Sequence, residues 1–454
     1  MPIDKKKAPD AMYFTSLSLE NVRAFGSPQS LTFVDKDNKI SLWNLILGGN
    51  GVGKTTLMQS LAVMWPVPGY ETRLDTTPTL STAELSESEE DGDIIHFMRR
   101  DGRGTGTMTA TLKTEAGAEV TVGVTIIGSM KLADKLKDVK WHNDPHILRS
   151  GGPLVIGYGA ARHVGHGNLA VVKERKATQS LFSDAIDLYD AEKIIEGLHY
   201  RAISSSAESG RDQQRLDRLK AAVARLLPDL TAAQIVINEP RVEGRDQSGV
   251  LVQTPSGVTP LAGLSLGYQT MFALTVDLAW RLIEAFPESN EPLYENAIVL
   301  IDEVDLHLHP QWQRSLRKHL LECFPKVQFI ATSHSPITAQ ETLSEGGNVA
   351  VVRWVEGEAH ILNNPIPKGE WRSDQLLESE LFGFGSDRSQ QAEAKIYERV
   401  ALIRKPNRTA EEEERLRELD EFVASLPTAP SPNVQSFEDL MMNLAKEYPS
   451  GMAR

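Results

Sequence analysis

Residues 41–65 read SLWNLILGGNGVGKTTLMQSLAVMW, and this stretch passes from a short apolar run through a glycine-rich segment into a helical pattern. The apolar run is typical of a buried strand, and Leu57, Leu61 and Met64 recur on one face of the helix that follows. Between them, residues 48–55 fit the pattern G-x-x-x-x-G-K-[ST]. A strand, a tight glycine loop and a helix in this order predict an α/β fold.

The glycine-rich segment has the composition of a loop that holds phosphate. Glycines let backbone N–H groups curl around phosphate oxygens, and the N-terminus of the following helix adds positive partial charge. Lys54 would neutralise the β- and γ-oxygens, and Thr55 would offer its hydroxyl to Mg²⁺. We therefore expect ATP and Mg²⁺ as ligands. The expected nucleotide contacts are Asn50, Gly51, Val52, Gly53, Lys54, Thr55 and Thr56.

Two further apolar strands are predicted to end in side chains that can act on a bound phosphate. They read AIVLIDE over residues 297–303 and VQFIATSH over residues 327–334. Asp302 would hold the water shell of Mg²⁺, and Glu303 would activate or orient the water that attacks the γ-phosphate. His334 would hydrogen-bond that phosphate and sense its loss. Taken alone, a carboxylate or a histidine at the end of a strand is equally compatible with a local cap.

A fourth element, LSLGYQ at residues 264–269, begins a predicted helix. The Ser265 hydroxyl and the backbone of Gly267 at a helix N-terminus can form an anion site, although helix capping alone would explain the same residues. The order Lys54, Ser265, Asp302 and His334 along one chain favours a shared function over four separate local roles.

This ordered set resembles the ATP-binding-cassette ATPases of the RecF, SMC and OLD type. Walker A is GGNGVGKT, the signature LSLGYQ, Walker B IVLIDE, the D-loop VDLHLHP and the switch segment TSHSP, and the likeness covers about residues 12–365. The resemblance implies a P-loop ATPase head that binds and hydrolyses ATP. It also implies self-association, because two heads of that family enclose two nucleotides, with Ser265 and Gly267 acting in the partner's site.

Two arginines are implied at further places in the resemblance. Arg23 lies in Asn21-Val22-Arg23-Ala24, where the family has an element that contacts nucleotide phosphates. No glutamine stands out at the family's Q-loop, and Arg162 in YGAARH occupies a comparable place. The pair His307 and His309 suggests a metal only weakly, since the sequence DLHLHP is usual in the family as a loop.

The order of the predicted elements divides the chain into four regions. Hairpins are expected over 12–35 and 105–127, the second as an antiparallel arm, and helices are expected over 181–200 and 211–227. The regions are 1–180, the N-terminal half of the head with Walker A and the arm; 181–230, a short helical lobe; 231–365, the C-terminal half with the signature, Walker B and the switch histidine; and 366–454, a helical C-terminal extension that could dock a partner.

Charge and hydropathy limit the class of protein. The net charge of the 454 residues is −14, and residues 71–93 and 411–421 supply most of it. The rest of the chain is nearly neutral, so a local basic patch, such as 99–103 or 173–176, could contact DNA. No stretch is long and apolar enough to predict a secretion signal or a membrane span, so we expect a cytoplasmic protein.

The C-terminal sequence suggests a more specific resemblance, to ATPases of bacterial anti-phage defence of the Septu type. The residues that carry it are WRSDQLL at 371–377 and ELFGF at 380–384. It implies that the heads regulate a separate HNH-type nuclease. We expect no intrinsic nuclease, because the sequence after His334 has no strand-tipped DxD, HNH or Cys/His pattern. A RecF/SMC-like repair or chromosome-maintenance ATPase, and the sensor of a Toprim-nuclease anti-restriction system, remain alternatives.

Overall fold

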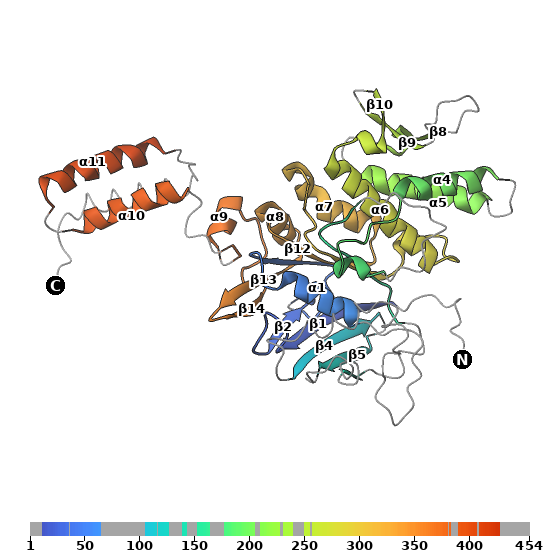
Figure 1. Cartoon of the computed structure of the whole chain (residues 1–454), viewed down its shortest axis with the longest axis horizontal. Coiled ribbons are helices and arrows are strands. Elements are labelled where there is room, and N and C mark those ends of the chain that lie inside the picture. The colour runs from blue at the N-terminus through green and yellow to red at the C-terminus, as the bar shows by residue number, and fades with distance from the viewer. Residues whose placement is uncertain are drawn as a thin grey trace. The chain divides into compact units, whose positions relative to one another are not determined.

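The computed structural model divides the chain into two units, residues 1–383 and 384–454, which are described separately below (Figure 1). The residues that the structure describes are 11–35, 37–64, 105–115, 117–126, 139–142, 152–163, 177–204, 209–227, 230–238, 249–254, 257–379, 381–382, 389–405 and 408–426. The acidic segment 71–93, the basic stretches 99–103 and 173–176, and the end of the predicted helical extension, residues 427–454, all lie outside them.

A six-stranded sheet forms the centre of the first unit. Its order is β14-β13-β3-β12-β11-β7, and only the edge strand β14 runs antiparallel to its neighbour. The strands are β3 (Trp43–Gly48), β7 (Val155–Tyr158), β11 (Ala297–Ile301), β12 (Val327–Ser333), β13 (Asn348–Val355) and β14 (Glu358–Asn363). The chain therefore has the α/β fold expected from the sequence, and the segments after β3, β11, β12 and β13 meet at one edge.

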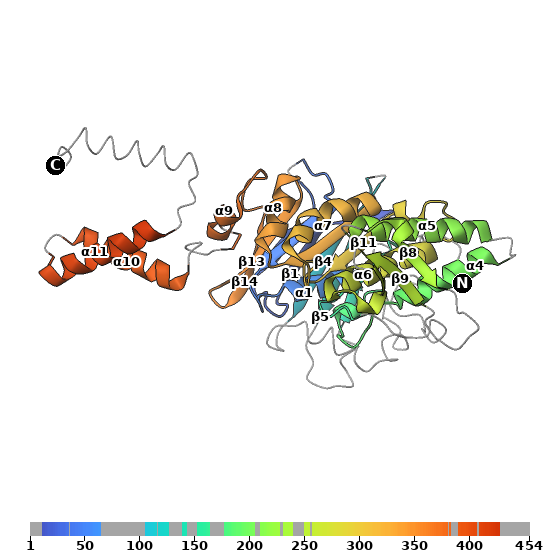
Figure 2. The same ribbon diagram turned by 90° about the horizontal axis from the view of Figure 1, so that it is seen from above.

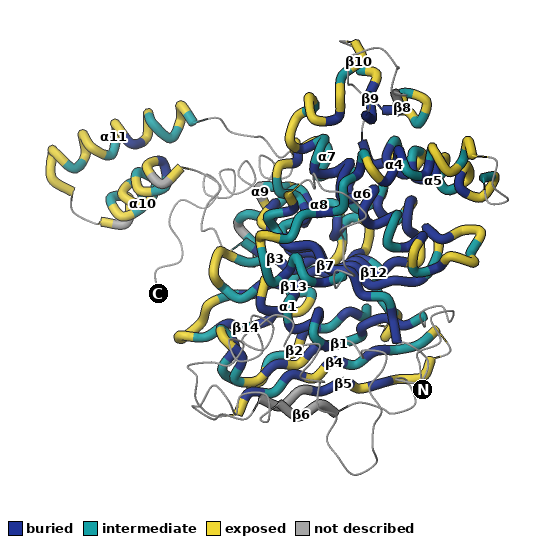
Figure 3. The backbone as a smooth tube through the Cα atoms, turned by 45° about the vertical axis from the view of Figure 1, so that its right-hand side comes forward, coloured by how far each residue is buried: buried dark blue, intermediate teal, exposed yellow. Residues whose placement is uncertain are grey.

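Both faces of this sheet are covered, which explains why its strands are continuous apolar runs. Leu45, Leu47 and Val299 belong to one buried cluster, whereas their neighbours Ile46 and Leu300 belong to the other. All five side chains are at most 1% exposed. Alternate residues of each strand thus face opposite layers, as the two-residue period of a strand requires. Figure 3 shows this buried centre in β3, β7 and β12.

The layer on one face consists of α1 (Lys54–Val63) and a second sheet, which is antiparallel. The second sheet has the order β2-β1-β4-β5-β6, with bounds Gln29–Thr32, Met12–Glu20, Gly106–Thr114, Glu119–Ile126 and Val139–His142. Both expected hairpins are confirmed. They form one sheet because β1 pairs with β4 as well as with β2, so the expected arm continues the first hairpin.

Helices cover the opposite face (Figures 1 and 2). They are α4 (Ala191–Ile203), α5 (Ser209–Leu226), α6 (Leu266–Ala285) and α7 (Pro310–Cys323), followed by α8 (Pro336–Ser344) and α9 (Ser373–Glu378). A small antiparallel sheet of β8 (Ile235–Asn238), β9 (Gly249–Thr254) and β10 (Gly257–Pro260) lies between α5 and α6 in sequence. Leu376 and Leu381 are buried in the same core.

The first helix of the lobe begins ten residues later than expected. The sequence pattern placed it over 181–200, but residues 182–190 are not helical, and Ile186 lies outside α4. The Asp190 side chain accepts a hydrogen bond from the backbone N–H of Lys193 at 3.1 Å. Aspartate at this position satisfies an N–H that the helix leaves unpaired, so it sets the start of the helix.

A buried carboxylate connects α6 to β7 and to the chain entering α4. Asp277 is fully buried and accepts hydrogen bonds from the Tyr158 hydroxyl at 2.7 Å, the Tyr189 backbone N–H at 2.8 Å and Arg281 Nε at 2.6 Å. The charge is thus paired and hydrogen-bonded, as burial requires. The helical lobe is therefore attached to the strand next to β11.

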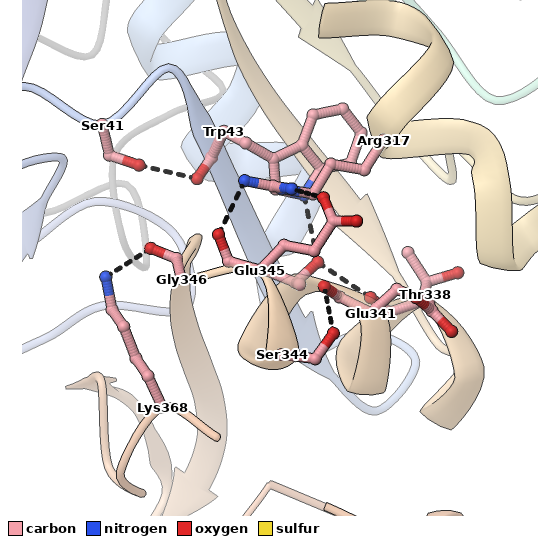
Figure 4. A network of polar contacts seen from close by, with 10 residues as sticks. Ser41, Trp43, Arg317, Thr338, Glu341, Ser344, Glu345, Gly346 and Lys368 are labelled. Carbon is pink, nitrogen blue, oxygen red and sulfur yellow. Dashed lines mark hydrogen bonds and ion pairs between the residues drawn. The ribbon is translucent and has the colours of Figure 1, made fainter. Parts of the chain in front are cut away.

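The chain between α8 and β13 is held by polar contacts drawn in Figure 4. Arg317 of α7 forms an ion pair with the Glu345 carboxylate and also donates to the Glu345 carbonyl oxygen at 3.1 Å. Lys368 Nζ donates to the Gly346 carbonyl oxygen at 2.6 Å, and the Trp43 indole N–H donates to Thr342 Oγ1 at 3.0 Å. These contacts fix the approach to β13 from two sides.

The second unit contains α10 (Gln390–Arg404) and α11 (Ala410–Ser425), in the region where the sequence predicts a helical extension. Lys395 lies over the Phe422 ring and Lys405 pairs with Glu412, so the two helices run antiparallel. Within the described part of the chain, no helix combines the length and apolar character that crossing a membrane requires.

Candidate active site

The turn between β3 and α1 is tight enough to require its glycines. A Cβ on Gly48 would lie 2.5 Å from the carbonyl oxygen of Val352, because β13 runs directly beside β3. A Cβ on Gly53 would lie 3.0 Å from the Phe25 ring, and Gly53 has φ of +106°. Glycine fits both positions at low energetic cost, because it has no Cβ and readily adopts a positive φ. The Val52 side chain packs against the apolar cluster under the loop.

Lys54 folds back over this loop. Its Nζ donates to the carbonyl oxygens of Gly48 at 2.9 Å and Gly49 at 2.8 Å and lies 2.9 Å from Nε2 of His334. The side chain is buried, and burial lowers the pKa of the Lys54 ammonium, while the charge of Asp302 raises it. The expected proximity of Lys54 and His334 is therefore present, although 280 positions separate them.

Thr55 and Asp302 form the pair expected at a magnesium site. Thr55 Oγ1 donates to Asp302 Oδ2 at 2.7 Å, and the Thr332 hydroxyl donates to the other oxygen of the same carboxylate. Asp302 is 5% exposed and immediately follows β11. A hydroxyl and a carboxylate oxygen side by side are the hard oxygen ligands that Mg²⁺ takes, so the donor set fits that ion.

Glu303 has an unusual backbone that its neighbours hold in place. Its φ is +50°, in the left-handed region that glutamate rarely adopts. Its N–H donates to Thr332 Oγ1 at 2.7 Å, and its carbonyl oxygen accepts from Arg162 Nη2 at 2.6 Å. Strain of this kind costs about 1–3 kcal/mol and persists only where the surroundings enforce it.

Arg162 is the deepest cation of the site. It is 5% exposed, and its Nε has no hydrogen-bond partner among the residues that the structure describes. Burial lowers the pKa of the Arg162 guanidinium to about 10, opposed by the charges of Asp305, Asp302 and Glu303. Burial also raises the pKa of the Asp305 carboxyl, and burial and the charge of Lys54 lower the pKa of His334.

These residues surround one cavity of about 500 Å³. It is lined by Arg23, Ala24, Asn50, Gly51, Gly53, Lys54, Thr55, Thr56, Asp302, Glu303 and Trp354. The structure therefore brings together most of the candidate residues, including Arg23 from the turn after β1. His334 joins them through Lys54, whereas Val52 contributes to packing below the loop.

Ser265 and Gly267 do not line this cavity. Ser265 is the N-cap of α6, yet its side chain makes no capping hydrogen bond and is exposed. A Cβ on Gly267 would lie 2.6 Å from the His307 carbonyl oxygen, so glycine is needed for close packing against the loop after β11. Tyr268 and Trp312 add an edge-to-face contact there, with ring centroids 4.3 Å apart.

The loop after β11 contains the two histidines considered as metal ligands. His309 Nδ1 accepts a hydrogen bond from the Gln311 N–H at 3.3 Å and thereby caps α7. Among the residues that the structure describes, no three His, Cys, Asp or Glu side chains are grouped as a metal site. The local role is thus the observed one.

Two residues of the site were missed at the sequence level. Thr332 holds both Asp302 and the Glu303 backbone, and it lies in β12, two positions before His334. Trp354 lines the cavity from the end of β13. No local sequence signal identifies Trp354, because its exposure and its place beside the P-loop follow only from the fold.

The fold and site define a P-loop ATPase, and comparison with known families agrees. Residues 174–339 match the family described as "AAA domain, putative AbiEii toxin, Type IV TA system". The match includes the signature, Walker B and His334. The P-loop at residues 48–55 precedes it. The matched residues and the P-loop thus have the sequence features of a P-loop ATPase domain of the AAA type.

The chain is also similar to proteins that are named after the Septu and retron systems. The chain is 25% identical over 354 residues to the Septu protein PtuA of Bacillus mycoides strain KBAB4, covering 75% of this chain and 41% of the relative. It is 39% identical over 114 residues to the Retron Vc95 probable ATPase of Vibrio cholerae serotype O1 biovar El Tor. This similarity covers 25% of this chain and 22% of that relative. The resemblance inferred from the motifs is confirmed.

The chain spans less than half of the length of these curated relatives. Among solved structures, the SMC head domain from Thermotoga maritima is similar with a TM-score of 0.39 and 15% identity, over 77% of this chain and 98% of that one.

Proposed function

We propose that the chain binds ATP with Mg²⁺ in the cavity between the P-loop and β11 and hydrolyses it. The observation that supports this most is the meeting of Lys54, Thr55, Asp302 and Glu303 around one cavity at the carboxyl edge of the sheet. Bound Mg²⁺ would be held by Thr55 and Asp302 and would neutralise charge on the phosphates. Measurement of phosphate release from ATP tests the assignment.

Each residue contributes a separate part of the proposed reaction. Lys54 exchanges its contacts with the loop carbonyls for contacts with phosphate oxygens. Glu303 accepts a proton from the attacking water or orients it, and its backbone is held by Arg162 and Thr332. His334 lies beside the Lys54 ammonium and can therefore donate to the same phosphate group.

Arg162 is proposed as a positioning residue for Glu303. In Arg162→Ala we expect turnover to fall about tenfold to a hundredfold, because a shift of about 1 Å in a reacting group has an effect of that size. The affinity for ATP should change by less than about threefold, since Arg162 does not line the cavity. Single-turnover hydrolysis and equilibrium binding separate the two quantities.

Arg162→Lys provides the conservative comparison and should recover part of the rate. Equal losses in affinity and turnover would show that Arg162 supports the whole loop and not Glu303 alone. Thermal unfolding of both variants reports whether the fold is retained.

We also propose that two heads associate around nucleotide, with Ser265 and Gly267 of each head completing the other's site. Two observations support this proposal. The Ser265 side chain is exposed and makes no capping hydrogen bond to α6, and Ser265 does not line the cavity of its own head. The proposal predicts complementation between two inactive variants. Lys54→Ala has a damaged P-loop, and Ser265→Arg has a damaged signature.

In a mixture of these two variants, one composite site of the mixed dimer has an intact P-loop and an intact signature. ATP turnover should therefore reappear on mixing and reach a maximum near equal proportions. Each variant alone should remain inactive. A mixture with no more activity than the sum of its parts would contradict the composite site.

The relatives support a role in defence, so we propose that the head regulates a separate HNH-type nuclease. The region after 365 is the proposed docking region, and its α10–α11 pair forms a unit of its own. Copurification with the product of a neighbouring HNH-type gene, with and without residues 384–454, tests this. A neighbouring Toprim gene would favour the anti-restriction alternative, and the absence of both would favour a repair ATPase.

A further inference from the structure

Trp354 is unusually exposed for a large aromatic side chain near the end of a buried strand. It is the penultimate residue of a strand whose first five residues are buried, yet its side chain is 55% exposed. Ala350 and Val352 precede it at two-residue intervals and face the layer that contains α1. The alternation of a strand places Trp354 on that same face, and it lines the cavity above the P-loop.

The position of Trp354 relative to the P-loop is fixed by backbone pairing. Val352 pairs with Gly48, the first residue of the loop, and leaves no room for a side chain there. Trp354 pairs with Ala359 of β14, and the Ala359 N–H donates to the Ala24 carbonyl oxygen at 2.8 Å. The turn that carries Arg23 is thus attached to the cross-strand partner of Trp354.

The order of the strands gives the cavity two chemically different ends. β13 lies on one side of β3, whereas β11, which carries Asp302 and Glu303, lies two strands away on the other side. Three strand spacings of about 4.8 Å separate β13 from β11 by about 14 Å. The carboxylates thus lie at one end and the Trp354 indole at the other, and the P-loop after β3 lies between them.

We propose that Trp354 is the stacking platform for the base of a purine nucleoside triphosphate, with Arg23 on the opposite side of the base. This inference rests on the proposed function of the same cavity. Indole is a large flat apolar surface on which any base can stack, and a guanidinium adds a cation–π contribution. A purine presents more area than a pyrimidine, so the subsite selects for ring size and not for exocyclic groups.

Binding of three probes tests the proposal: ATP, CTP and inorganic tripolyphosphate, each with Mg²⁺ in calorimetry. Wild type should bind ATP more tightly than CTP and tripolyphosphate. Trp354→Ala should weaken ATP binding about fivefold to a hundredfold, narrow the gap between ATP and CTP, and leave tripolyphosphate within about twofold. Trp354→Phe should stay within about threefold of wild type for ATP.

Tyr294→Ala is the matched control, because Tyr294 is an aromatic side chain 48% exposed on the same unit and lines a different hollow. It should leave all three affinities unchanged. Wild-type affinity for ATP in Trp354→Ala, or equal losses for ATP and tripolyphosphate, would overturn the stacking role. Failure of wild type to bind either ATP or tripolyphosphate would instead overturn the proposed function.

Discussion

Lys54→Ala should lose ATP turnover by about a hundredfold to a thousandfold, which is the cost of removing one group that stabilises charge in a transition state. ATP affinity should fall about tenfold to a hundredfold, because a hydrogen bond to a charged group contributes roughly 1.5–3 kcal/mol. Lys54 is the P-loop side chain whose ammonium already lies against the loop carbonyls and His334.

The variant should still fold. Burial lowers the pKa of Lys54, which shows that its charged form is destabilised by the loss of water, and alanine removes that charge together with its stem. The measurements are phosphate release, ATP calorimetry and thermal unfolding. Lys318→Ala is the matched control, since Lys318 is an exposed lysine of α7 and should behave as wild type. Wild-type turnover in Lys54→Ala would remove the P-loop from the proposed reaction.

Glu303→Gln should bind ATP normally and hydrolyse it about a hundredfold to ten-thousandfold more slowly, the range for loss of a general base. Glutamine keeps the shape of the side chain and the backbone contacts with Arg162 and Thr332, but it cannot accept a proton. Because the nucleotide persists, ATP-bound dimers should accumulate and be visible by light scattering after size exclusion.

Glu356→Gln is an unusually close control for this experiment. Glu356 is also a glutamate with positive φ, at +49°, but it is exposed in the turn between β13 and β14. It should show wild-type turnover and no accumulation of dimers. Unchanged turnover in Glu303→Gln would remove Glu303 from its proposed role, whatever the state of assembly.

The central part of the site could be predicted from sequence because parallel strands share an edge. Lys54, Asp302 and His334 each follow a strongly apolar strand, and carboxyl ends of parallel strands meet. Their convergence therefore follows from fold class without knowledge of strand order. The glycine-rich loop could also be predicted, because the spacing of its glycines reflects the local path of the backbone.

The far end of the cavity could not be predicted in this way. Trp354 belongs to a strand that the sequence indicated, but its proximity to the P-loop depends on β13 lying directly beside β3. That pairing joins residues about 300 positions apart, and no local pattern reports it. Arg162 is similar, because its contact with Glu303 requires β7 to be the neighbour of β11.

Some short helices and strands could not be predicted from the sequence, for a different reason. α8 has nine residues and β14 has six, too few for a periodic pattern to stand out. The late start of α4 was readable in principle from Asp190, whose capping role is local.

The close packing of Gly267 against the His307 carbonyl oxygen bears on how ATP hydrolysis in two associated heads would be coordinated. It joins the start of α6 to the loop that follows Glu303, with no side chain between them to absorb a small displacement. Packed elements of this kind move as a body and do not deform gradually. In a nucleotide-bound dimer, loss of phosphate from one head would therefore be transmitted through that head's own signature into the opposite site. The two ATP molecules would be consumed as coupled events, and turnover would rise sigmoidally with ATP concentration.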